Sequence, residues 1–161
     1  MFNCEYSISS LEDGIANLGE VMVCTSGYSM WPMLRNRKDM VIVEKVTRPL
    51  KKHDVPVYRL KSGKVVMHRI IKITRDGKYI IRGDNCYVNE HGITDDNIIG
   101  VLREFYRGGK HCVCATSKAY KLYVFYVRTS YPFRFVFKKL MKELRKIPLL
   151  RKIKRAIFPK K

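Results

Sequence analysis

Acidic side chains are nearly absent from the last third of the chain. Of the 14 Asp and Glu residues in the 161-residue sequence, only Glu143 lies in residues 118–161, whereas that segment holds 15 of the 33 Lys and Arg residues. The net charge of +19 therefore divides into +14 for this segment and +5 for residues 1–117. We expect an anionic partner, either a membrane surface or a nucleic acid, to meet the protein at this end.

Long apolar runs are also missing. A spanning helix needs roughly 20 consecutive apolar residues, and the best candidate, residues 120–137, is interrupted by Lys121, Arg128 and Pro132. The N-terminus has no basic segment followed by an apolar run, which a secretory signal peptide would show. These absences predict a cytoplasmic protein that is at most peripheral to a membrane.

The cysteines do not form a recognisable framework. There are five, an odd number, and they have no repeated spacing, so the sequence does not predict a set of disulfides. His111, Cys112 and Cys114 stand close together, but a structural metal site would need a second pair of ligands. Alternating cysteines on a strand are more often core packing. We therefore expect no metal and no cofactor.

The first 116 residues change from helical to strand periodicity. Residues 1–20 contain Ser9 and Ser10 followed by apolar residues at helical spacing, which predicts a short amphipathic helix over residues 10–20. Short apolar runs separated by Gly-containing turns then predict a mainly β, antiparallel domain over residues 21–116, because strands and helices do not alternate there. The expected strands are residues 21–25, 40–46, 55–60, 65–73, 79–82 and 97–106.

Residues 117–161 are predicted to form a tail of basic amphipathic helices. Pro132 is expected to end the first helix, and Pro148 to interrupt the next. The apolar faces are formed by Tyr120, Tyr123, Val124 and Val127, then by Val136, Leu140, Leu144 and Ile147, with Lys and Arg elsewhere around the helices. Such a tail either packs on the β domain or lies on an anionic membrane. The excess of lysine favours membrane binding through residues 132–161.

A small polar turn at residues 26–34 lies between two apolar runs, Val21–Cys24 and Met40–Val43. A turn in this position can hold a hydroxyl at a fixed angle in a cleft, although an isolated turn of this kind is more often only a β-turn. His68 stands within an apolar strand, and Asp84 in a turn that ends the next strand. Composition alone permits a Ser/His/Asp site without requiring one.

Three motifs occur in an order that is characteristic of one enzyme family. Ser26-Gly27-Tyr28-Ser29-Met30-Trp31-Pro32 resembles the S-G-x-S-M-x-P box of signal peptidases and LexA-like serine peptidases. Val66-Met67-His68-Arg69-Ile70 resembles the strand of the branch that uses His as the base, and Arg82-Gly83-Asp84-Asn85 resembles the G-D-N box. Residues 98–102 fit the last core strand, so the resemblance covers about residues 20–106. It implies a signal-peptidase-like antiparallel β domain.

The resemblance also implies roles for single residues. Ser29 would be the nucleophile and its backbone N–H an oxyanion donor, His68 the general base, and Asp84 the group that orients the imidazole. Met30 and Pro32 would shape the substrate groove. The substrate would be a leader-like, signal-like or precursor peptide that binds in an extended conformation.

Several features depart from the family pattern. Tyr28 is an extra residue relative to the S-G-S-M box of true signal peptidases, so Ser26 is not assigned as an oxyanion donor. Glu90 stands where related enzymes carry an acidic residue and is an alternative to Asp84 as the third group. A transmembrane anchor before the serine box is also missing, which makes a cytoplasmic precursor peptide the more natural substrate.

A second hypothesis comes from a different class of function. The β domain would then be a non-catalytic scaffold whose basic tail binds an anionic membrane or a nucleic acid. Nucleic acid is the less favoured ligand because the sequence has no recognition motif for it. A self-cleaving repressor would need a DNA-binding domain before the serine box, and only about 20 residues precede it.

Overall fold

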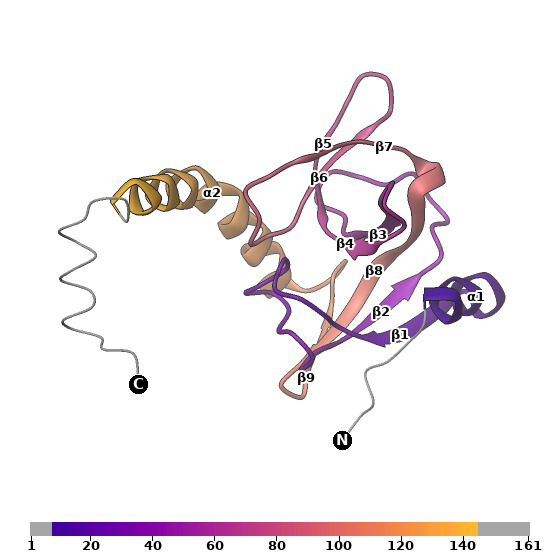
Figure 1. Cartoon of the computed structure of the whole chain (residues 1–161). Coiled ribbons are helices and arrows are strands. Elements are labelled where there is room, and N and C mark those ends of the chain that lie inside the picture. The colour runs from indigo at the N-terminus through magenta and orange to yellow at the C-terminus, as the bar shows by residue number, and fades with distance from the viewer. Residues whose placement is uncertain (1–7, 145–161) are drawn as a thin grey trace, which may run out of the picture. The chain divides into compact units, whose positions relative to one another are not determined.

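The computed structural model describes residues 8–144, and the described chain divides into two units between Val124 and Phe125. The first unit is mainly β, with two antiparallel sheets preceded by the helix α1 at Ile8–Leu18 (Figure 1). The long helix α2, Lys118–Leu144, begins in the first unit and continues in the second. The predicted architecture of a short helix, an antiparallel β domain and a C-terminal helix is confirmed at this level.

The larger sheet is organised around one long strand, β8, at Ile98–Arg107. The order of the sheet is β1-β2-β8-β3-β4, and β9 also pairs with β8. On one edge β8 pairs with β2, and on the other with β3 and then β9. The remaining strands are β1 at Glu20–Cys24, β2 at Met40–Glu44, β3 at Pro56–Arg59, β4 at Val65–Met67 and β9 at Lys110–Val113. Among the described strands, β1 pairs only with β2 and β4 only with β3, so each leaves one edge open.

The smaller sheet has the order β5-β6-β7, with strands at Arg69–Ile73, Tyr79–Arg82 and Glu90–Ile93. A short 3-10 helix at Asp95–Asn97 leads from β7 into β8. Gly77, whose φ of 77° is in the left-handed region, closes the turn between β5 and β6. In this sheet, Gly83 of the turn after β6 and Glu90 at the start of β7 both lie close to His68, the residue that follows β4.

The prediction of a single strand over residues 65–73 is wrong. The chain leaves the larger sheet after Met67 and enters the smaller sheet at Arg69, so His68 lies at the corner between them. The His68 N–H donates to the Pro56 carbonyl at 3.3 Å, and the Ile70 N–H donates to the Asp54 carbonyl at 2.9 Å. The apolar run has no Gly or Pro at this point, and tertiary contacts make the corner instead.

Two buried clusters form the core of the first unit. In the first cluster, Leu11 and Ile15 of α1 pack with Val43 and Val57 of the larger sheet. The second cluster joins the two sheets through residues that include Tyr58, Ile70, Ile81 and Val101. Tyr58, Ile70 and Ile81 are completely shielded from solvent. Burial of side chains of this size contributes about 1.5–3 kcal/mol each, so the clusters hold the corner at His68 in place.

The helix α2 continues through Pro132, and the predicted break there is wrong. A proline removes one intrahelical donor, here the N–H that would pair with the Arg128 carbonyl, at a cost of about 3 kcal/mol. The helix is long enough to continue on both sides of it. No helix within residues 8–144 has the length and apolar character needed to cross a bilayer. The predicted stripe at Ile147 and the break at Pro148 lie outside the described residues.

Candidate active site

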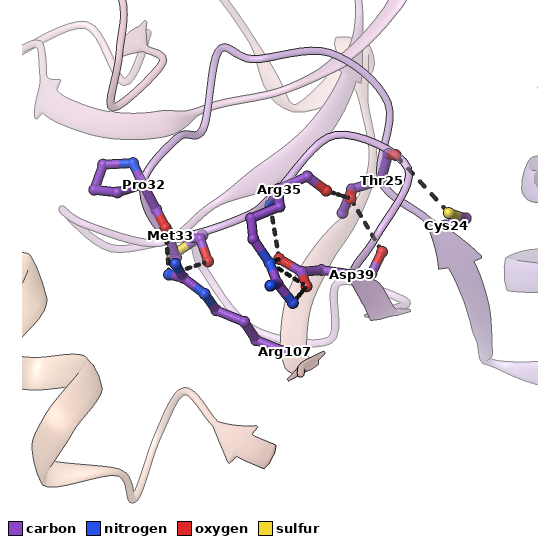
Figure 2. Close-up of polar contacts among 7 residues, drawn as sticks. All are labelled: Cys24, Thr25, Pro32, Met33, Arg35, Asp39 and Arg107. Atoms are coloured by element: carbon purple, nitrogen blue, oxygen red, sulfur yellow. Dashed lines mark hydrogen bonds and ion pairs between the residues drawn. The ribbon is translucent and has the colours of Figure 1, made fainter. Parts of the chain in front are cut away.

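Ser29 lies in the loop between β1 and β2, and the ends of this loop are tied together by Thr25. The Thr25 hydroxyl lies 2.8 Å from the Arg35 carbonyl and 3.0 Å from the Asp39 carbonyl, to which the Thr25 N–H also donates at 3.0 Å (Figure 2). Thr25 is itself buried. The loop that contains Ser29 is therefore closed at its base.

A buried carboxylate stiffens the same loop. Asp39 is fully buried, and its carboxylate accepts a hydrogen bond from the Arg35 N–H at 2.7 Å and bonds from the Arg35 guanidinium at 2.6 and 3.0 Å (Figure 2). Arg107 of β8 donates to the carbonyls of Pro32 and Met33 from outside the loop. Charge-assisted bonds of this kind are the strong ones in proteins, so the backbone around Ser29 is held from two directions.

The turn after β6 contacts both the serine loop and His68. The Asn85 N–H donates to the Ser29 carbonyl at 2.7 Å, and the Asn85 side-chain amide donates to the Tyr28 carbonyl at 3.1 Å. A β-carbon on Gly83 would lie 2.7 Å from the Ser29 carbonyl oxygen and 3.0 Å from His68 Cδ2. Ser29 and His68 thus both approach the same glycine.

The substitution Gly83→Ala tests this close approach. The added methyl group meets a backbone oxygen that cannot move without shifting the loop, so we expect the free energy of unfolding to fall by roughly 1–3 kcal/mol. Denaturant unfolding measures that loss. We also expect a loss of the activity proposed below that exceeds the fraction of unfolded protein, because Ser29 moves relative to His68. Unchanged stability would contradict the tight packing.

His68 is buried and forms a closed polar cluster with two other side chains. Its Nδ1 atom lies 3.0 Å from Glu90 Oε1 and 3.1 Å from the Tyr58 hydroxyl, and this hydroxyl donates to Glu90 Oε2. Burial lowers the pKa of the His68 imidazole, and the Glu90 carboxylate acts against that shift. Burial and Glu90 both raise the pKa of Tyr58, which stays a hydrogen-bond donor. A neutral ring that donates from Nδ1 to Glu90 carries its lone pair on Nε2.

Asp84 has a different set of partners. Both of its carboxylate oxygens accept hydrogen bonds from the Arg69 guanidinium, at 2.8 and 2.7 Å, and the Tyr123 hydroxyl donates to it at 3.0 Å. Arg69 and Asp84 are both buried. Glu90, the alternative third group, is the residue that the structure places at His68 Nδ1, and the effect of Asp84 on the pKa of His68 is smaller than that of Glu90.

Arg69 connects the corner at His68 to the turn after β6, to the loop at His53 and to the start of α2. Besides Asp84, its guanidinium donates to the His53 carbonyl at 3.0 Å and to the Tyr120 hydroxyl at 2.9 Å. It also lies over the rings of Tyr120 and Tyr123, 5.6 and 5.9 Å from their centroids, in cation–π geometry. Burial lowers the pKa of Arg69, but the contacts with Asp84 outweigh it and raise the pKa overall. The charged side chain is thus fully compensated, and the start of α2 is part of its site.

Ser29 and His68 line one groove, which has a volume of about 580 Å³. Ser26, Met30 and Glu90 also line it, and its apolar wall comes from β1 to β4, with Val23, Val41, Val57, Val65 and Met67. Pro32, the other predicted substrate-binding residue, is not among the lining residues, and its carbonyl accepts a bond from Arg107. The described residues show no hydrogen bond between Ser29 and His68. Such bonds often tighten only when a substrate is bound.

The side chains around β9 are engaged in packing and hydrogen bonding. Cys112 and Cys114 pack against the first core cluster, which confirms the packing interpretation. His111 Nε2 lies 2.6 Å from Glu104 Oε2. Within residues 8–144 no group of three His, Cys, Asp or Glu side chains has an arrangement that could hold a metal ion.

Tyr58 and Glu90 are the two residues of the site with the weakest signals in the sequence. Tyr58 has the alternating pattern of a core strand, and nothing distinguishes it from other buried tyrosines. Glu90 belongs to β7, whose residues Glu90-His91-Gly92-Ile93 have little strand propensity. Only its position after the G-D-N box pointed to it.

Comparisons of the chain with protein-family models, with curated proteins and with solved structures give no match.

Proposed function

We propose that the protein is a serine endopeptidase with a signal-peptidase-like β domain, which cleaves a leader-like, signal-like or precursor peptide. The observation that carries the proposal is the buried His68, held through Nδ1 by Glu90 in the same groove as Ser29. A nucleophile, a base and a group that orients the base are the parts that serine catalysis requires. Ser29 and His68 are the catalytic residues in this proposal, and Glu90 positions the base.

The proposed reaction follows from the state of the imidazole. His68 Nε2 removes the proton from the Ser29 hydroxyl while Oγ attacks the peptide carbonyl carbon. Glu90 then stabilises the imidazolium, which gives its proton to the leaving amine. A water molecule, deprotonated by the same nitrogen, releases the acyl group and restores Ser29. The Ser29 backbone N–H supplies one oxyanion donor, and a donor of this kind is worth about 10²–10³ in rate.

The open edges of the larger sheet indicate how a peptide would bind. β1 and β4 each leave one edge open among the described strands, and side chains of both strands line the groove. An extended peptide can add to such an edge through main-chain hydrogen bonds, while alternate side chains enter pockets. The valines and methionines of the wall favour apolar side chains in the substrate.

Covalent labelling with a fluorophosphonate tests the proposal. The activated Ser29 Oγ should form a bond to phosphorus with loss of fluoride, giving one adduct on the peptide that contains residue 29 by mass spectrometry. Ser29→Ala and His68→Ala should abolish the adduct. Ser26→Ala, a change in the same loop and groove, should retain it. A wild-type protein that is folded but not labelled would favour the non-catalytic scaffold.

A further inference from the structure

The part of α2 beyond Val124 carries a stripe of exposed apolar side chains on one face. A helix turns by about 100° per residue, which places the members of the stripe within an arc of roughly 120°. Their exposed fractions are 64% for Phe125, 52% for Tyr126, 78% for Phe133, 63% for Val136, 64% for Phe137 and 54% for Leu140. Large apolar side chains that remain exposed in a row of this length indicate a binding surface.

Positive charges follow one border of this stripe. Arg128 and Lys139 are exposed and eleven residues apart, which is about three helical turns, so they lie on the same side of the helix. The sequence around them is also strongly basic, since residues 118–161 carry 15 Lys and Arg residues and a single acidic residue, Glu143. The surface therefore combines an apolar face with a basic border.

We infer that this face of α2 lies in the interface of a membrane that contains anionic phospholipids. The aromatic and aliphatic side chains of the stripe enter the boundary between head groups and acyl chains, while Arg128 and Lys139 meet the phosphates. Binding of this type gains from the buried apolar area and from the charge attraction together. The inference does not depend on the peptidase proposal.

Two other occupants fit the surface less well. A second copy of the chain would bring two strongly basic segments together, and like charges oppose that association. A single-stranded nucleic acid needs aromatic faces on which bases stack. The stripe includes Val136 and Leu140, which offer no such face, and its charges lie at the border instead of among the rings.

Vesicle sedimentation with the full chain tests the inference. The probes are vesicles of phosphatidylcholine alone and of phosphatidylcholine with phosphatidylglycerol. Phe133→Asp is compared with Phe135→Asp, which makes the same change in charge two residues away. Phe135 is 42% exposed and lies outside the stripe, with its ring 6.0 Å from that of Tyr131. Circular dichroism checks that both variants keep their helix, and Phe133→Leu keeps the apolar character.

The wild type should bind the anionic vesicles and bind pure phosphatidylcholine much less. Phe133→Asp should weaken binding by roughly tenfold more than Phe135→Asp, because only Phe133 loses its burial in the interface. Phe133→Leu should bind nearly as the wild type does. Equal losses in the two aspartate variants, binding that ignores lipid charge, or no binding at all would overturn the inference. So would a salt-sensitive complex with a polynucleotide that Phe133→Asp weakens while vesicles are not bound.

Discussion

Alanine at Ser29 is expected to lower kcat/KM for peptide cleavage by a factor on the order of 10⁴ or more, and alanine at His68 by a similar factor. Each change removes a group through which the proposed reaction must pass. The double variant should be little worse than either single one, because residues that act as a unit lose their effect together. A library of extended peptides, assayed with and without anionic vesicles, supplies the substrate for the measurement.

Two controls make this result specific. Ser26→Ala removes a hydroxyl from the same loop and the same groove, and its effect should be far smaller than that of Ser29→Ala. Thermal or denaturant unfolding should show that Ser29→Ala and His68→Ala both remain folded, with a loss of stability in His68→Ala because this variant removes a buried imidazole. Cleavage that survives in Ser29→Ala would contradict the assignment of the nucleophile.

The two acids near His68, the half-buried Glu90 and the buried Asp84, should have different effects on activity and on stability when they are substituted. Glu90→Gln keeps the size of the side chain but removes the charge at His68 Nδ1, so we expect kcat to fall by a factor on the order of 10²–10⁴ with a modest change in stability. Asp84→Asn instead leaves Arg69 buried without its counter-charge. Removing one partner of a buried ion pair costs about 3–5 kcal/mol, so this variant should be strongly destabilised, while its folded fraction retains more activity than Glu90→Gln.

The pH dependence of kcat distinguishes an electrostatic role of Glu90 from a merely structural one, because only the electrostatic role affects the pKa of His68. Burial lowers the pKa of His68 from its ordinary value of 6.5, so the acid limb of the wild-type kcat profile should lie below pH 6.5. Glu90 raises that pKa, and its removal should therefore move the limb to still lower pH. A limb that stays in place in Glu90→Gln, or one that moves in Asp84→Asn by more, would assign the third role to Asp84.

Local patterns predicted most of the strands but not the place where the two sheets separate. α1, β1, β2, β3, β6 and β8 begin and end within two residues of the predicted ranges, because alternating apolar residues and Gly turns are local signals. The corner at His68 depends on carbonyls of Asp54 and Pro56, which are remote in sequence. At Pro132 the local signal was also insufficient, because α2 continues through a residue that usually ends a helix.

The site shows the same division between local and distant determinants. The motifs brought Ser29, His68 and the turn at Asp84 into consideration, and the structure brings Ser29 and His68 to one groove. The pairing of Glu90 with His68 requires β7 to lie beside β6, and the pairing of Asp84 with Arg69 joins the end of β6 to the start of β5 across the smaller sheet. Neither contact is marked by a motif in the sequence. The sequence therefore identified both acids as candidates for the third group but did not show which of them contacts His68.

The position of Arg69 has a practical consequence for anyone who shortens this protein. The start of α2 supplies Tyr120 and Tyr123, whose rings cover the guanidinium. The Tyr120 hydroxyl accepts a bond from Arg69, and the Tyr123 hydroxyl donates to Asp84. A truncation at residue 116 would open the site of a buried cation one residue away from His68. A stop after Val124 would keep both tyrosines and remove the exposed aromatic stripe. A shortened version of the protein that keeps the Arg69 site intact therefore includes the first two turns of α2.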